Sequence, residues 1–190
     1  MKSIVLVGIP GSGKSTILQE VARQIPNVTI VNYGDKMLQE AASEGVTRDL
    51  LRKMPFEEQK HIGMKAARKI IQQETGDVVI IDTHALIRTS IGYCPGLPLE
   101  VLQLISPIAY AFVECLPHII LERRAKDNAR TRDEETIEDL QMHLDLTRSF
   151  LTACCMQTGS LLCRIQNSHS EISQNALPLL NLCRSIHPRA

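Results

Sequence analysis

The sequence contains no tryptophan and only three tyrosines and three phenylalanines among its 190 residues. Proteins that bind single-stranded nucleic acid use aromatic side chains as stacking platforms, so this scarcity argues against that class. The chain also lacks an excess of charge of either sign, because 21 Lys and Arg balance 21 Asp and Glu. General nucleic-acid binders usually carry a basic excess. We therefore expect no nucleic-acid partner, and any anionic ligand would be attracted by a local patch.

Long apolar runs and metal-binding cysteine spacings are missing as well. The apolar run at residues 3–7 ends at Gly8 with no cleavage pattern behind it, and no stretch approaches the roughly 20 apolar residues that span a bilayer. We therefore expect a cytoplasmic protein without a signal peptide or membrane association. The six cysteines form no CxxC pair and no zinc spacing. This favours reduced core thiols, although disulfides remain possible if the source is a hyperthermophile.

The chain does have a regular alternation of short β-rich apolar runs with longer amphipathic segments. The expected strands are 3–7, 28–32, 77–82, 109–115 and 160–166. The expected helices are 14–25, 35–43, one beginning near Pro55, one beginning near Pro117, 136–156 and 171–184. This alternation predicts one α/β domain, a parallel sheet with helices on both faces. Ligands of such folds bind at the carboxyl ends of the strands, so the residues just after each strand are the candidates.

The segment after the first strand, GIPGSGKST, matches the phosphate-binding pattern GxxxxGK[ST] in full. Its glycines allow backbone N–H groups to turn toward phosphate oxygens, and the next helix adds its positive end. Lys14 is expected to reach the β- and γ-phosphates of a nucleotide, and Ser15 to bind Mg²⁺. The alternative is a glycine-rich turn without a ligand, which the strand before it and the helix after it disfavour.

Residues 82–89, DTHALIRT, follow the third strand. Asp82 ends an apolar run, where a carboxylate without a partner is costly to bury. Mg²⁺, bound directly or through water, would be such a partner, and the alternative is an Asp that caps the next turn. Arg88 is either a second phosphate clamp or a surface arginine. His84 is a weaker candidate, because a lone histidine is more often structural than a phosphate ligand or a titrating group.

Two further segments have the lengths or shapes of binding elements. Residues 33–76 separate the second and third strands, which is far more than a simple crossover needs. They contain Arg48, Arg52 and Lys53, and they form either a site for a second substrate or a longer helical connection. The segment GYCPGLP, residues 92–98, predicts a shaped loop close behind Arg88, with or without a ligand.

The segment 122–139 is the most charged part of the chain, with five positive and seven negative side chains. It is therefore not a stripe for polyanion binding. Arg123, Arg130 and Arg132 lie between the fourth and fifth strands, where a mobile lid would stabilise a transferring phosphoryl group and exclude water. The alternative is a solvated helix–loop–helix face.

Five segments in this order resemble the archaeal-type adenylate kinases over nearly the whole chain: GIPGSGKST, VNYGDKML, LLRKMP, IDTHALIRTSIGYCPGLP and ERRAKDNARTRD. The fourth is the most specific, because many classes of protein share the first. The resemblance implies a doubly wound five-stranded parallel sheet in the order 2-3-1-4-5, Mg²⁺-dependent ATP + AMP ⇌ 2 ADP, and a homotrimer without zinc. It divides the single domain 1–190 into a core (1–32, 77–122 and 136–190), a monophosphate-binding insertion (33–76) and a short lid (123–135).

The resemblance also implies roles for individual residues. The ATP phosphates would be bound by Gly8, Ile9, Pro10, Gly11, Ser12, Gly13, Lys14, Ser15 and Thr16, and the position near the adenine base would be Asn167. The AMP site would contain Asn32, Tyr33, Gly34, Arg52 and Arg88, the two arginines holding the phosphate. The transferring group would be clamped by Arg123, Arg130 and Arg132. Lys14 and Arg88 would complete the catalytic set. The Mg²⁺ ligands would be Ser15 and Asp82.

Two alternative functions stay open at this point. One is a nucleoside monophosphate kinase that prefers UMP, CMP or GMP. The other is a switch or assembly factor that hydrolyses ATP to change its affinity for a partner. A GTPase is disfavoured, because the sequence has no NKxD-like tetrapeptide for guanine.

Overall fold

The computed structural model describes residues 2–42, 45–74, 76–89, 91–126, 135–168 and 171–186, with the side chains of all of these except residues 49 and 52. The predicted lid residues Arg130 and Arg132 lie outside these ranges. No helix within them combines the length and the hydropathy needed to cross a bilayer. All six cysteines are described, and all are free thiols.

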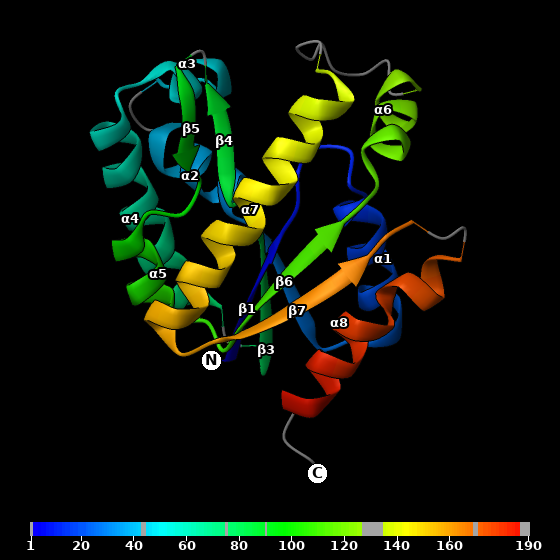
Figure 1. Cartoon of the computed structure of the whole chain (residues 1–190). Coiled ribbons are helices and arrows are strands. Elements are labelled where there is room, and N and C mark those ends of the chain that lie inside the picture. Colours follow the sequence, from blue (N-terminus) through cyan, green and yellow to red (C-terminus); the bar gives the residue numbers. More distant parts are fainter. Residues whose placement is uncertain are drawn as a thin grey trace.

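The centre of the molecule is a parallel sheet of five strands in the order β2-β3-β1-β6-β7 (Figure 1). These strands are β1 (Lys2–Val7), β2 (Val28–Asn32), β3 (Val78–Thr83), β6 (Ala109–Glu114) and β7 (Leu161–Gln166). Because β6 and β7 are the fourth and fifth strands of this sheet along the chain, the observed order is the predicted 2-3-1-4-5. The sequence prediction of the sheet is therefore confirmed.

Helices cover both faces of the sheet, as the alternation of strands and helices predicted (Figure 1). The helices are α1 (Lys14–Gln24), α2 (Tyr33–Ala42), α3 (Arg48–Lys53), α4 (Phe56–Gln73), α5 (Leu99–Ile105), α6 (Pro117–Ala125), α7 (Ile137–Thr158) and α8 (Ile172–Ile186). Successive side chains of a strand point to opposite faces, so β1 contributes to two cores. Val5 and Val7 pack with residues of α4, α5 and α7, whereas Ile4 and Leu6 pack with residues of α1 and α8.

A small antiparallel hairpin, β4 (Leu86–Thr89) and β5 (Gly92–Pro95), was not predicted from the sequence. It contains Arg88 and most of the segment expected to be a shaped loop. Gly92 has φ 143°, a conformation that glycine adopts without strain. Just after β5, the Gly96 N–H donates to the Ala85 carbonyl at 2.8 Å, so the hairpin returns onto the turn that follows β3.

Tyr33, the first residue of α2, lies below the surface of the predicted monophosphate-binding insertion. Its side chain is only 2% exposed, and its hydroxyl has no hydrogen-bond partner among the described residues. A Cβ atom at Gly63 of α4 would lie 2.5 Å from that hydroxyl oxygen. Burial also raises the pKa of the Tyr33 phenol. The absence of a side chain at Gly63 therefore provides the space that the Tyr33 hydroxyl occupies.

This contact predicts that the effect of Gly63→Ala depends on Tyr33. Alanine is a better helix former than glycine by about 1 kcal/mol, yet in the wild-type background we expect Gly63→Ala to lower the free energy of unfolding because of the clash. Tyr33→Phe removes the hydroxyl, and in that background Gly63→Ala should instead raise the free energy of unfolding. Urea denaturation of the four proteins measures both effects. The same sign in both backgrounds would show that the hydroxyl does not constrain Gly63.

Candidate active site at the carboxyl edge of the sheet

The loop between β1 and α1 is shaped by two glycines in the left-handed region, Gly11 at φ 90° and Gly13 at φ 91°. Residues with a side chain rarely adopt such values. The Ser12 N–H donates to the Ile9 carbonyl at 3.1 Å, which closes the turn, and α1 begins at Lys14 directly after Gly13. The loop thus leads into the N-terminus of an 11-residue helix, the geometry that proteins use to bind phosphate.

Lys14 is folded back against its own loop and against the end of β3. Its ammonium nitrogen donates to the Gly8 carbonyl at 3.0 Å and lies 3.9 Å from a carboxylate oxygen of Asp82. The Lys14 and Asp82 side chains are only 11% and 14% exposed. Their proximity follows from the sheet register, in which Leu6 of β1 is paired with Asp82 of β3. Two neighbouring parallel strands thus bring the predicted phosphate-binding lysine and the predicted metal ligand to one edge.

Asp82 is a largely buried carboxylate whose surroundings suit the binding of a cation. Burial raises its pKa, and this effect is opposed by Lys14 and by the Asn32 side chain, whose amide donates to Asp82 Oδ2 at 3.1 Å. Asp82 Oδ1 has no hydrogen-bond partner within the described part of the chain. Ser15 lies exposed in the first turn of α1. A carboxylate and a hydroxyl are oxygen ligands of the kind that Mg²⁺ takes, usually one or two from the protein with phosphates and water completing the shell.

Asn167, which follows β7, holds the loop from the other side. Its side-chain amide donates to the Ser12 carbonyl at 2.7 Å, and its Oδ1 accepts from Asn175 of α8 at 2.9 Å. A Cβ atom at Gly13 would lie 2.1 Å from the Asn167 amide nitrogen, so only glycine fits at this position. Asn167 is therefore a support of the phosphate-binding loop, in addition to its predicted place near a nucleotide base.

Arg123 of α6 supports the same loop. Its guanidinium donates to the Ser12 carbonyl at 3.3 Å, to the Asn167 carbonyl at 3.1 Å and to the Cys115 sulfur at 3.3 Å. Arg123 was predicted from the sequence to clamp the transferring phosphoryl group. In the structure its guanidinium donates to the two main-chain oxygens and the sulfur beside the loop, so among the described residues it acts as a support of the loop.

Arg124 and Glu135 lie beside the candidate site, and the sequence did not predict them as part of it. Arg124 donates to the Pro10 carbonyl at 2.9 Å and forms an ion pair with Glu135. Glu135 also pairs with Arg88 at 3.1 Å, and Asp139 lies 3.8 Å from the same guanidinium. One carboxylate thus joins the predicted monophosphate-binding arginine to an arginine of α6 that contacts the phosphate-binding loop. The mixture of positive and negative side chains in segment 122–139 indicated ion pairs, but it did not indicate which side chains pair.

The structure does not bring the described side chains of the other residues predicted for the AMP site together at one position. Asn32 lies at the edge beside Asp82, and its Oδ1 accepts the N–H of Asp35, so it also caps α2. Gly34 lies in the first turn of that helix. Tyr33 is buried, and its hydroxyl faces Gly63. Arg52 belongs to α3, where its backbone alone is described.

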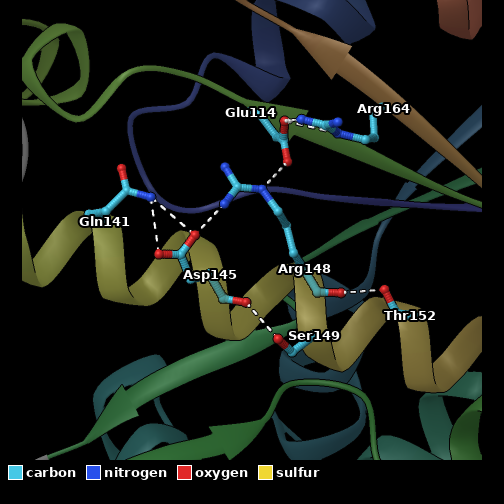
Figure 2. Close-up of polar contacts among 7 residues, drawn as sticks. All are labelled: Glu114, Gln141, Asp145, Arg148, Ser149, Thr152 and Arg164. Atoms are coloured by element: carbon cyan, nitrogen blue, oxygen red, sulfur yellow. Dashed lines mark hydrogen bonds and ion pairs between the residues drawn. The ribbon is translucent and has the colours of Figure 1, made fainter.

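A second network of charges lies at the end of β6 (Figure 2). Glu114 accepts from Arg148 of α7 at 2.7 Å and from Arg164 of β7 at 2.7 Å, and Arg148 also pairs with Asp145. The main-chain carbonyl of Glu114 accepts the Asn167 N–H at 2.8 Å. This network therefore joins the end of β6 to α7 and to β7, the strand that Asn167 follows.

Comparison with known proteins agrees with this geometry. A family model described as an AAA domain matches residues 7–141. The structure is similar to a shikimate kinase from Bacteroides thetaiotaomicron, with a TM-score of 0.61 and 15% identity over 96% of this chain and 98% of the other. A shikimate kinase from Acinetobacter baumannii gives a TM-score of 0.59 and 16% identity over 100% and 96%. Fold and phosphate-binding loop together define a P-loop kinase fold.

Curated sequences identify the family. The chain is 39% identical to an adenylate kinase of Thermococcus onnurineus over 92% of this chain and 90% of the relative. It is 38% identical to that of Pyrococcus furiosus over the same shares, and 35% identical to that of Methanothermobacter thermautotrophicus over 90% and 94%. The chain therefore belongs to the adenylate kinase family.

Proposed function

We propose that the protein transfers a phosphoryl group reversibly from ATP to AMP, giving two ADP. The observation that carries this proposal is the bridge between two positions that the sequence predicts to bind phosphate. Lys14 follows the P-loop directly, and Arg124 of α6 donates to the Pro10 carbonyl of that loop. Arg88 lies on the hairpin, and Glu135 contacts both Arg124 and Arg88. Two cationic positions that share one carboxylate lie close together, as transfer between the terminal phosphate of ATP and the phosphate of AMP requires. Family membership supports the same reaction.

In this proposal the protein positions two nucleotides and neutralises charge, and it forms no covalent intermediate. Lys14 moves from the Gly8 carbonyl to the β- and γ-phosphates, while Arg88 exchanges Glu135 for the phosphate of AMP. Ser15 and Asp82 would hold Mg²⁺, which supplies further charge neutralisation at the phosphates. Arg123, Arg130 and Arg132 are proposed to stabilise the transferring group, together with the newly found Arg124.

The domain division is proposed in the same terms: a core (1–32, 77–122 and 136–190), a monophosphate-binding insertion (33–76) and a lid (123–135). We further propose a cytoplasmic homotrimer. Exposed apolar side chains near the junction of α7 and β7 support self-association, since Met156 is 82% exposed and Leu161 is 66% exposed. β7 is also an edge strand of the sheet. Apolar side chains beside a sheet edge are typical of protein contact surfaces.

A steady-state assay with ATP and each of AMP, UMP, CMP and GMP tests the proposed function. We expect ADP formation that requires Mg²⁺ and is fastest with AMP. A clear preference for another monophosphate would assign a different kinase within the superfamily. Hydrolysis of ATP at a rate that does not depend on any monophosphate, with no monophosphate phosphorylated, would favour the switch instead.

A further inference from the structure

His84 lies in the turn between β3 and β4, two residues after Asp82, and the reaction proposed above gives it no role. Its Nδ1 atom is 2.8 Å from the carbonyl oxygen of Gly8 and 3.5 Å from the ammonium nitrogen of Lys14. A carbonyl oxygen only accepts hydrogen bonds, so Nδ1 carries the hydrogen and donates a hydrogen bond to the Gly8 carbonyl. Lys14 donates to the same oxygen at 3.0 Å. The Gly8 carbonyl thus accepts from two side chains.

During turnover only one of these two donors can stay on the Gly8 carbonyl. Lys14 has to leave Gly8 when it reaches the nucleotide phosphates. Gly8 is buried, and a buried carbonyl that loses its hydrogen-bond donor keeps the cost of its desolvation without compensation. The imidazole, in contrast, is anchored by its main chain. With His84 present, the Gly8 carbonyl keeps a donor after Lys14 has moved. Without His84, the Gly8 carbonyl would lose its remaining side-chain donor when Lys14 moves. This cost holds Lys14 on the carbonyl and thereby weakens the binding of phosphate.

The main chain of His84 is held in place by the segment after β5. A Cβ atom at Gly96 would lie 2.0 Å from the His84 carbonyl oxygen, so this close contact requires glycine. The Gly96 N–H also donates to the Ala85 carbonyl at 2.8 Å. The GYCPGLP segment therefore fixes the backbone of the turn that presents the imidazole to the P-loop, which gives this motif a physical role.

From these contacts we infer that His84 is a positioning residue for the P-loop. Its Nδ1–H holds the Gly8 carbonyl and thereby releases Lys14 for the phosphates of ATP. The inference deepens the proposed phosphoryl transfer and rests on it for the identity of the phosphate donor. The substrate that His84 affects is the nucleotide on the P-loop, and the effect is transmitted through Lys14.

Two amide substitutions separate this role from a general structural one. His84→Asn places an amide nitrogen close to the position of Nδ1, whereas His84→Gln places it close to that of Nε2. We expect His84→Gln and His84→Ala to raise KM for ATP by roughly three- to tenfold, the range for loss of one hydrogen bond, with KM for AMP nearly unchanged. His84→Asn should restore most of the ATP affinity. Equal behaviour of the Asn and Gln variants, or equal changes in both KM values, would overturn the inference.

Calorimetric titration with ATP alone keeps this test independent of the proposed reaction. The difference in ATP affinity between His84→Asn and His84→Gln should be present even if AMP were not the acceptor. The same pair of variants in a Lys14→Met background should show no difference, because the effect passes through Lys14. A difference that persists without the lysine would contradict the proposed route. Thermal melting identifies any variant that fails to fold. If His84→Ala does not fold, the comparison of ATP affinity between His84→Asn and His84→Gln still decides the test.

Discussion

Lys14→Ala is expected to lower kcat by about a hundred- to a thousandfold, the loss typical of removing one preorganised group that stabilises charge in the transition state. Lys14 is the cation that the P-loop pattern assigns to the β- and γ-phosphates. Its ammonium group also lies 3.9 Å from Asp82 in a partly buried position. Steady-state kinetics with saturating ATP and AMP measure the effect on kcat. A near-normal kcat with a native circular dichroism spectrum would show that the P-loop is not the phosphate site.

The same substitution should also lower the melting temperature, for a reason unrelated to catalysis. Without Lys14, Asp82 loses a charge that opposes the increase of its pKa by burial. Lys14→Ala combined with Asp82→Asn removes the buried charge and should therefore recover stability without recovering turnover. This double variant is the control that separates a damaged fold from a missing catalytic group.

Arg88→Ala is expected to raise KM for AMP by about one to two decades and to leave KM for ATP nearly unchanged. A bidentate pair between arginine and phosphate contributes roughly 1.5–3 kcal/mol, which corresponds to that range. In the structure Arg88 pairs with Glu135 and Asp139, so its guanidinium is already directed toward acidic oxygens beside the P-loop. Varying each substrate at a saturating concentration of the other gives the two KM values.

Two variants serve as controls for Arg88. Arg88→Lys keeps the charge and loses the planar fork, so it should recover only part of the AMP affinity. Arg48→Ala removes an exposed arginine of the insertion whose partner is Asp35, and it should have little effect on either KM. If Arg88→Ala raised both KM values equally, Arg88 would not belong to the monophosphate site.

The layout of the sheet was predictable because its strands are short, apolar and separated by amphipathic helices. The hairpin β4–β5 was not, because its two strands have four residues each and one ends in a proline. Such short segments show no clear period of two. Helices α3 and α5 have six and seven residues, which is likewise too short for a helical pattern. Their formation depends on packing against the rest of the chain.

The site was predictable where strand ends determine it. Asn32 and Asp82 lie at the carboxyl ends of β2 and β3, and Lys14 follows the loop after β1, so the three had to meet at one edge of the sheet. The ion pairs of Arg124 and Glu135 join the end of α6 to the residues just before α7, and no periodicity in the sequence specifies that pairing. Nor did the sequence indicate that the Tyr33 hydroxyl is buried, since this depends on the missing side chain at Gly63.

The central claim is that one molecule binds two nucleotides with their phosphates facing each other, and a compound that bridges both sites tests it most directly. Two adenosines joined by five phosphates are such a compound. Linking the ligands makes the second binding event intramolecular, which gains about two to four decades over the separate affinities. Calorimetric titration with ATP, AMP and the bridged compound in the presence of Mg²⁺ should therefore show one-to-one binding of the bridged compound, far tighter than that of ATP. Affinity no better than that of ATP, with AMP still able to bind the loaded protein, would contradict the two-site arrangement.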